Sequence, residues 1–123
     1  MKDNQLKDKL LEDFLKVKPQ HAVDLFFHLA KVLTTFGVVY IKAKKTMIAF
    51  EAGKSFVWVV YFGKDFLDVV IPFNEKFEHN SCFYKIKTVP GTNQHNHYIR
   101  MYFVEDLNNE VISYLFKAFN NKE

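Results

Sequence analysis

Four residues in the second half of the chain have the side chains that zinc prefers. They are His79, Cys82, His95 and His97, in the pattern H-x2-C-x12-H-x-H. Imidazole and thiolate ligands in a set of four could close a tetrahedral site. One residue separates the last two histidines, whereas paired zinc-binding histidines usually have three to five between them. Two interpretations stay open, a zinc site and ordinary polar histidines in a loop, and we favour the second.

A second group combines aromatic and basic side chains on segments that we expect to be strands. Its members are Lys45, Phe56, Trp58, Tyr61, His97 and Arg100, with Tyr98 beside them. Aromatic faces next to cations can stack nucleobases or hold anionic ligands. Strict alternation places Val57, Val59 and Tyr61 on one face of their strand, and Phe56, Trp58, Val60 and Phe62 on the other. Because both faces are apolar, the competing interpretation is that Phe56 and Trp58 are core residues.

Motifs of known catalytic sites are absent from the sequence. It has no G-x-S-x-G elbow, no phosphate-binding G-x-x-x-x-G-K loop, no G-x-G-x-x-G and no H-E-x-x-H. Cys82 and a nearby histidine could form a nucleophile pair, but no third group is available to orient the histidine. The sequence leaves the question of an enzyme open, and we favour a non-enzymatic protein, with no cofactor apart from the zinc ion considered above.

The basic residues are unevenly distributed. The chain has 17 Lys and Arg against 14 Asp and Glu, a net charge of +3. Residues 42–54 contain four Lys and one Glu, and residues 83–100 contain two Lys and one Arg without an acid. If these segments became neighbouring strands, one face of the protein would be positive and could bind an anionic ligand or nucleic acid. Otherwise the lysines are the usual polar side of half-exposed strands.

The aromatic content is high for a chain of 123 residues, with 14 Phe, six Tyr and one Trp. This length fits one domain, in which most Phe should fill the space between a sheet and its helices. The single Cys excludes an intramolecular disulfide and fits a reducing compartment. The longest apolar run, 56–62, is far shorter than the roughly 20 residues of a membrane span, and the N-terminus does not resemble a signal peptide. We expect a cytoplasmic protein that does not enter a membrane.

Apolar residues at helical spacing predict three helices. The first lies within 1–18 with Asp3 as N-cap, and the second covers 19–36, from Pro19 to the glycine at position 37. The third follows Asp106, its predicted N-cap. Its buried stripe is predicted to be Leu107, Val111, Leu115 and Ala118 with Phe119.

Alternation with a period of two predicts strands at 38–44, 46–51, 55–62, 66–71, 83–89 and 97–104. Gly53 suits a hairpin turn, and Pro72 should close the fourth strand. The fold class is therefore α+β, an antiparallel β-meander sheet of five to six strands packed with two N-terminal helices and one C-terminal helix. We expect one domain over 1–123, with an N-terminal helix in 1–18 and a core over 19–120.

Three stretches resemble the DUF5655 domain family, a bacterial family of unknown function. They are the helix 19–36 with its following glycine, the strands around 45–50 and 53–56, and the segment 97–100 with the helix that ends near Phe119. The sequence has Ser55 where the family usually has Asn. The resemblance covers about residues 14 to 120. It implies a compact α+β domain with no assigned reaction.

Two functional hypotheses follow from these observations. The first is a binding or interaction module that uses a basic and aromatic sheet face around Lys45, Trp58, Tyr61, Tyr98 and Arg100. Its partner would be an anionic ligand, a nucleic acid or a protein. The alternative is a small-molecule pocket protein or an enzyme of unknown reaction with an aromatic-lined cavity. The sequence leaves the choice between a monomer and a homodimer open.

Overall fold

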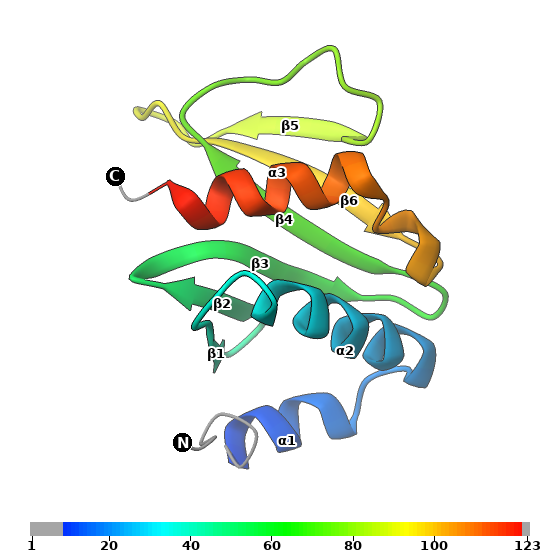
Figure 1. Cartoon of the computed structure of the whole chain (residues 1–123). Coiled ribbons are helices and arrows are strands. Elements are labelled where there is room, and N and C mark those ends of the chain that lie inside the picture. Colours follow the sequence, from blue (N-terminus) through cyan, green and yellow to red (C-terminus); the bar gives the residue numbers. More distant parts are fainter. Residues whose placement is uncertain (1–8, 122–123) are drawn as a thin grey trace.

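The predicted strands pair into one antiparallel sheet in the order β1-β2-β3-β4-β6-β5 (Figure 1). The computed structural model describes residues 9–121. Its elements are α1 (Lys9–Lys16), α2 (Gln20–Thr34), β1 (Tyr40–Ala43), β2 (Ile48–Ala52), β3 (Lys54–Phe62), β4 (Leu67–Phe73), β5 (Lys85–Thr88), β6 (His95–Met101), the 3-10 turn η2 (Val104–Asp106) and α3 (Asn109–Asn120). The α+β class with six strands, two N-terminal helices and one C-terminal helix is confirmed.

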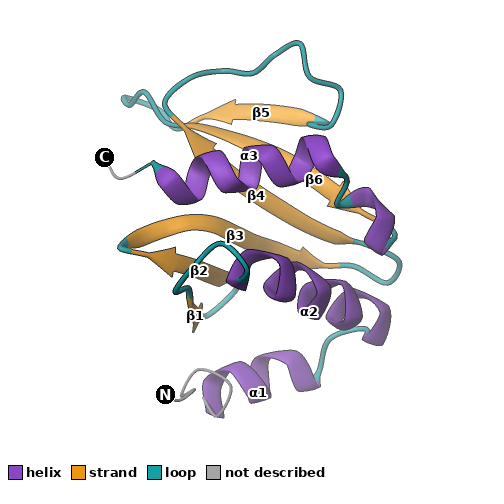
Figure 2. Cartoon of the chain, viewed as in Figure 1, coloured by secondary structure: helices purple, strands orange, loops and turns teal. Residues whose placement is uncertain are grey.

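The described helices pack against one face of the sheet (Figure 2). The buried residues of α2 are Ala22, Val23, Leu25, Phe26, Leu29, Ala30 and Leu33, which confirms the predicted apolar stripe. In α3 they are Val111, Leu115 and Ala118. The shorter α1 contributes Leu11 to this core, and its Phe14 packs edge-on against Phe62. Six of the 14 Phe are buried and four more pack against the core, so the aromatic excess is mainly a packing feature.

Two irregularities in β3 change which of its side chains face the helices. The pairing of β2 with β3 skips Phe56, and the pairing of β3 with β4 skips Val60. An extra residue in one strand resets the alternation of faces. As a result Phe56 and Val57 both belong to the helix-side core, where the Phe56 ring meets Phe119 edge-on at 5.5 Å. The strict alternation predicted for this strand is therefore wrong.

The middle of the sheet is split at one end. Strands β3 and β4 pair from Phe62↔Leu67 only as far as Trp58↔Val70, after which β4 pairs with β6 alone. In the described part of the chain no register pair joins 55–57 to 71–73, and the two strands diverge there (Figure 1). Pro72, which we predicted to close the strand, lies inside β4 opposite Asn96. A proline lacks an N–H and is tolerated where a strand has only one neighbour.

The C-terminal region differs from the sequence expectation in two respects. Asp106 belongs to η2 and is not the cap of α3; the Asn108 side chain accepts the Val111 N–H at 3.0 Å instead. In addition β6 lies between β4 and β5, so the last two strands do not follow a simple meander. The predicted cap Asp3 lies outside the described residues. Within residues 9–121, no helix has the length and apolar character needed to cross a membrane.

Gly37 ends the α2 region at a point where the chain approaches α3. A Cβ atom at this position would lie 2.9 Å from the ring of Phe119, and φ is +155°. Gly53, in the β2–β3 hairpin, has φ +83°, but a Cβ atom at that position would meet nothing within 4 Å. A substitution at Gly53 would therefore test backbone strain alone, whereas one at Gly37 would add a steric clash.

We predict that Gly37→Ala lowers the free energy of unfolding by about 2–3 kcal/mol, because it adds a clash to an unfavourable backbone conformation. Gly53→Ala should cost about 1 kcal/mol from backbone strain alone. Urea denaturation of both variants measures the difference. Equal losses in the two variants would contradict the proposed contact with Phe119.

Candidate functional site

The face of the sheet opposite the helices carries a continuous row of side chains, and we call it the open face. The row crosses all six strands through the successive partners Lys42, Ala49, Trp58, Val70, Tyr98 and Lys85. Ala49 and Val70 are buried, yet they lie outside the helix-side core. Directly opposed residues contact one another across antiparallel strands. The two rings flank Val70 and shield it, while an exposed lysine stands at each end of the row.

Tyr98 is the centre of the basic end of this row. The Lys85 ammonium lies 4.5 Å from the centroid of the Tyr98 ring, a cation–π distance. The ring of Tyr84 meets Tyr98 edge-on at 6.0 Å. Lys87, two residues further along β5, faces the same side as Lys85 and is exposed. The β5 side of the open face thus combines two lysines with two tyrosines.

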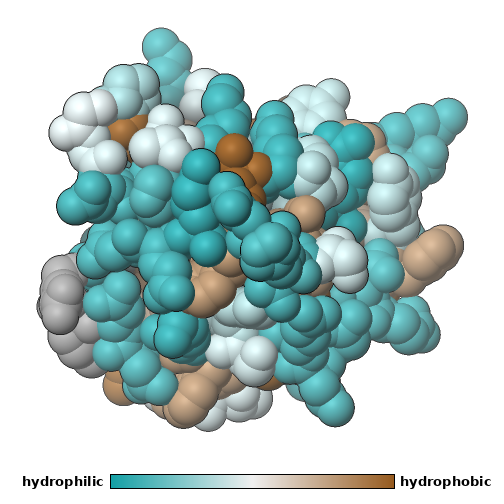
Figure 3. Space-filling view, turned by 90° about the horizontal axis from the view of Figure 1, so that it is seen from above, coloured by the Kyte–Doolittle hydropathy of each residue, from teal (hydrophilic) through white to brown (hydrophobic). Residues whose placement is uncertain are grey.

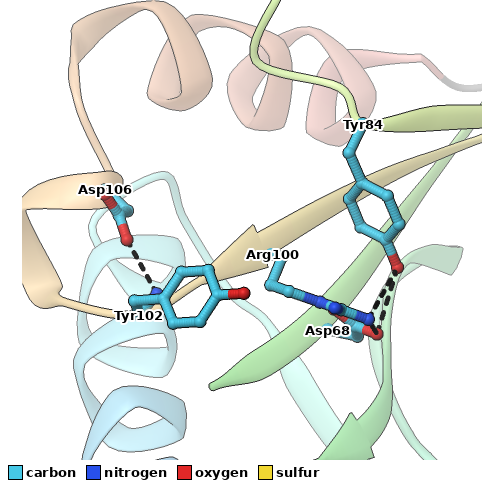
Figure 4. Close-up of polar contacts among 5 residues, drawn as sticks. All are labelled: Asp68, Tyr84, Arg100, Tyr102 and Asp106. Carbon is cyan, nitrogen blue, oxygen red and sulfur yellow. Dashed lines mark hydrogen bonds and ion pairs between the residues drawn. The ribbon is translucent and has the colours of Figure 1, made fainter. Parts of the chain in front are cut away.

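Arg100 also lies on the open face, but its charge is already neutralised. It pairs in register with Asp68, and its Nε and Nη2 atoms donate to the two carboxylate oxygens at 2.8 and 2.9 Å (Figure 4). The Tyr84 hydroxyl donates to the same carboxylate at 3.1 Å. Rings of Phe66 and Tyr84 contact the guanidinium, with centroids 4.1 and 4.9 Å from its carbon. Arg100 is therefore a structural clamp between β4 and β6.

The clamp also affects the ionisation of Tyr84 and Arg100. Asp68 is only 6% exposed, and the bidentate guanidinium places an opposite charge beside this buried carboxylate. Burial, followed by the Asp68 charge, raises the pKa of Tyr84 above its ordinary value. The hydrogen bond to Asp68 raises the pKa of Arg100. Nearby, the Asp106 carboxylate accepts the N–H groups of Tyr102 and Phe103 and turns the chain away from β6 (Figure 4).

Three residues of the predicted aromatic and basic group lie elsewhere, and one of them is Phe56, which belongs to the helix-side core. Lys45 is exposed in the turn between β1 and β2. Three to four strand spacings, about 14–19 Å, separate that turn from β6 and Arg100. His97 faces the helices and is fully buried. The structure therefore brings together Trp58, Tyr61, Tyr98 and Arg100 on the open face, without Lys45, Phe56 and His97.

His97 is a buried structural histidine with both ring nitrogens engaged. Its Nδ1 donates to the His95 carbonyl at 2.8 Å, and its Nε2 accepts the Phe77 N–H at 3.1 Å. Because a carbonyl only accepts and an amide N–H only donates, these partners require the neutral Nδ1–H tautomer. Rings of Phe73, Phe77 and Phe83 surround the imidazole. Burial among them lowers the pKa of His97.

The candidate zinc ligands do not converge. His79 is exposed, the Nδ1 of His95 is bonded to the Thr88 hydroxyl at 2.8 Å, and His97 has no free ring nitrogen. Across residues 9–121, no three His, Cys, Asp or Glu side chains are grouped in a way that could hold a metal ion. Burial, and then the charge of Glu110, raises the pKa of Cys82 to about 11. A thiol with that pKa is almost entirely protonated at neutral pH and is a poor nucleophile.

Sequence reasoning missed several residues of the open face. From the sequence, Lys42, Lys85 and Lys87 count only as part of the charge of two basic segments. Neither Phe66 nor Tyr84 belongs to a candidate site predicted from the sequence. The segment charges did carry the signal, because both segments contribute a strand to this sheet. They lie at opposite edges of the sheet, however, and are not neighbouring strands. The positive charge is therefore at the two ends of the row and not in one patch.

The structure has hollows at both ends of the sheet. One of about 150 Å³ lies in the split between β3 and β4, with Trp58 and Pro72 from the open face and Phe56 and Phe73 from the helix side. It adjoins a hollow of about 420 Å³ beside the end of α3, and the two share Phe73, Asn74 and Asn121. A third, also about 420 Å³, is lined by His21, Asp65, Tyr102 and Phe103. Seen from the side of β5, the surface is largely hydrophilic with separate hydrophobic side chains (Figure 3).

The fold and the open face define a class of protein: a single-sheet α+β domain with a one-sided helical layer. The chain belongs to the DUF5655 family, whose description is "Domain of unknown function" and whose model matches residues 11–122. The resemblance inferred from the sequence is thereby confirmed. Neither the curated proteins nor the solved structures contain a significant match.

We predict that Arg100→Ala lowers the free energy of unfolding by about 2–4 kcal/mol, because it leaves the buried Asp68 carboxylate without its partner. The double variant Asp68→Ala, Arg100→Ala should be more stable than Arg100→Ala, since no orphan charge remains. Lys44→Ala is the matched control. Lys44 lies 4.0 Å from Glu51 on the surface and should contribute less than about 1 kcal/mol. A loss in Arg100→Ala no larger than in this control would exclude the clamp.

A second prediction concerns pH. The folded state holds His97 neutral with a pKa below the ordinary 6.5, whereas the unfolded chain takes up a proton near that value. The resulting stability is present above pH 6.5 and is lost as the pH falls through the folded pKa. Each pH unit within that window should cost up to about 1.4 kcal/mol.

Urea denaturation between pH 5 and 8 measures this dependence. His97→Gln should flatten the curve between pH 5 and 6.5. His79→Gln, which alters an exposed histidine, should leave the curve unchanged. An unfolding free energy of the wild type that does not decrease between pH 6.5 and 5 would show that His97 is not held neutral.

Proposed function

We propose that this domain is a non-enzymatic binding module whose open face binds single-stranded nucleic acid. The observation that carries the proposal is the row across the sheet, in which Trp58 and Tyr98 lie between exposed lysines. Proteins that bind single strands combine aromatic stacking platforms with cations that follow the backbone. The lone cysteine fits an action in a reducing compartment such as the cytoplasm.

The charges that remain available support this partner. Arg100 is committed to Asp68, and Lys44 is near Glu51. By contrast, Lys42, Lys85 and Lys87 form no ion pair within the described part of the chain. Three cations at the ends of an aromatic row would meet the phosphates on either side of stacked bases. The modest net charge of +3 fits weak, salt-sensitive binding.

Stacking on Tyr98 requires Lys85 to leave the ring. An exposed cation–π contact is worth about 0.5–1 kcal/mol. A base stacked on an aromatic ring contributes about 1–3 kcal/mol. The exchange is therefore favourable, and the displaced ammonium remains close enough to pair with a phosphate. Trp58, on the other side of Val70, offers a second platform at two strand spacings, about 10 Å away.

The fluorescence anisotropy of a labelled 12-nucleotide mixed-sequence strand, as DNA and as RNA, tests the proposal over a series of salt concentrations. We expect Lys85→Ala, Lys87→Ala to weaken binding and to reduce the slope of log K against log salt by about 1.4, since each phosphate contact on a single strand contributes about 0.7. Lys16→Ala, Lys31→Ala removes the same charge from α1 and α2 and is the matched control. Equal effects of the two double variants would contradict a site on the open face.

Tyr98→Leu tests the stacking separately. Leucine still covers Val70 but has no π face, so affinity should fall roughly 5- to 100-fold while the salt slope stays the same. Circular dichroism and thermal unfolding verify that the variant is folded. No detectable binding of either strand by the wild type at low salt would refute the proposed function.

A further inference from the structure

We propose that the split between β3 and β4 receives one unstacked nucleobase of the strand that lies on the open face. This inference rests on the proposed function and adds a base-recognition site to it. The split begins directly beside the row, because Trp58↔Val70 is both part of the row and the last pair that joins the two strands. Trp58 itself lines the hollow. A strand stacked on the open face would therefore pass beside the hollow.

The shape of the hollow fits a single ring system. Its volume is about 150 Å³, well below the roughly 300 Å³ at which pockets for larger small molecules begin. The apolar half of its lining consists of the rings of Phe56, Trp58 and Phe73 with Pro72, and of Ala118 from α3. Because residues from both faces of the sheet line it, the hollow extends into the sheet and is not a depression on its surface. A planar group could enter edge-first between the diverging strands.

The other half of the lining is polar. It consists of Lys54, Ser55, Asn74, Gln94 and Asn121. The backbones of 55–57 and 71–73 form no register pair with each other among the described residues, so this gap presents strand edges to whatever enters it. Carboxamides and backbone N–H and C=O groups are the partners that read the edges of unstacked bases. Aromatic walls with such a rim match a nucleobase better than an aliphatic ligand, which would leave the polar rim without partners.

Two features explain why the split stays open. Pro72 has no N–H to donate to β3, and Phe56 is the extra residue of a bulge that interrupts the regular pleat of β3. Both are built into the strands, so the hollow exists before a ligand binds. The Asn74 side chain makes no hydrogen bond to another described residue and is exposed at the rim. It is therefore available for an incoming base.

Oligonucleotides with a single abasic site test this inference. In the strand used above, each nucleotide in turn is replaced by its abasic form, and the affinity for the wild-type protein is measured. If one base enters the split, one central position should lose about tenfold or more and the other positions should lose much less. A uniform profile, with the intact strand still bound, would overturn the inference and leave the proposed function intact. Absence of binding by the intact strand would refute both.

Protein variants locate the sensitive position. Ser55→Phe fills the hollow and should make the abasic profile uniform, whereas Thr46→Phe, an equally large change in the β1–β2 turn, should leave the profile unchanged. Asn74→Ala changes only an exposed rim residue and should weaken the intact strand about fivefold, with a smaller effect on the strand that lacks the recognised base. A sensitive position that persists in both Ser55→Phe and Asn74→Ala would place the base elsewhere.

Titration with free adenosine, guanosine, cytidine and uridine distinguishes a base in a strand from a free nucleoside. Amide resonances of 55–57, 71, 73 and 74 should shift with the preferred nucleoside at millimolar concentration, and Ser55→Phe should abolish the shifts. Binding of the nucleoside as tight as that of the strand would show that the hollow serves a free metabolite, and would overturn the inference.

Discussion

The pairing of β4 with its two neighbours is the constraint on which the rest of the structure depends. Where β4 pairs with both β3 and β6, the register aligns Trp58, Val70 and Tyr98 on one face and Val59, Val69 and Ile99 on the other. The second set enters the core beneath the helices. A shift by one residue would exchange the two faces and expose the core. The open face and the hydrophobic core are therefore two consequences of one register.

The Asp68–Arg100 pair adds a polar restraint to the same strands. Its cost is that a carboxylate must be buried, and its benefit is a directional bond that only the observed register allows. This restraint also removes Arg100 from the charges that could attract a ligand. Arg100, one of the two basic residues in the predicted aromatic and basic group, is thus structural. Lysines at the sheet edges, which looked like ordinary surface residues, carry the available charge.

Much of the fold was predictable because the apolar periods of its helices and strands are strong. The hairpin glycine at 53, the stripe of α2 and the fold class all follow from local rules. The bulge at Phe56 did not, since it depends on how β2 and β3 meet and leaves no local pattern. The burial of His97 was equally hidden, because the rings around it come from β4, its following loop and the segment before β5. A candidate site predicted from the alternation of side chains along a strand is wrong wherever a bulge or a buried polar residue breaks that alternation.

Pro72 illustrates how a local rule can fail and still be informative. A proline inside a sheet normally indicates an edge, and the sequence therefore suggested that the strand stopped there. The strand continues through Pro72 instead. At this point β4 pairs with β6 but no longer with β3, so the sheet has an edge in its interior. An internal edge leaves backbone groups and aromatic side chains beside a hollow, without unfolding either strand. Such an opening is costly unless it is filled on binding, and this is the physical reason to look for function in the split.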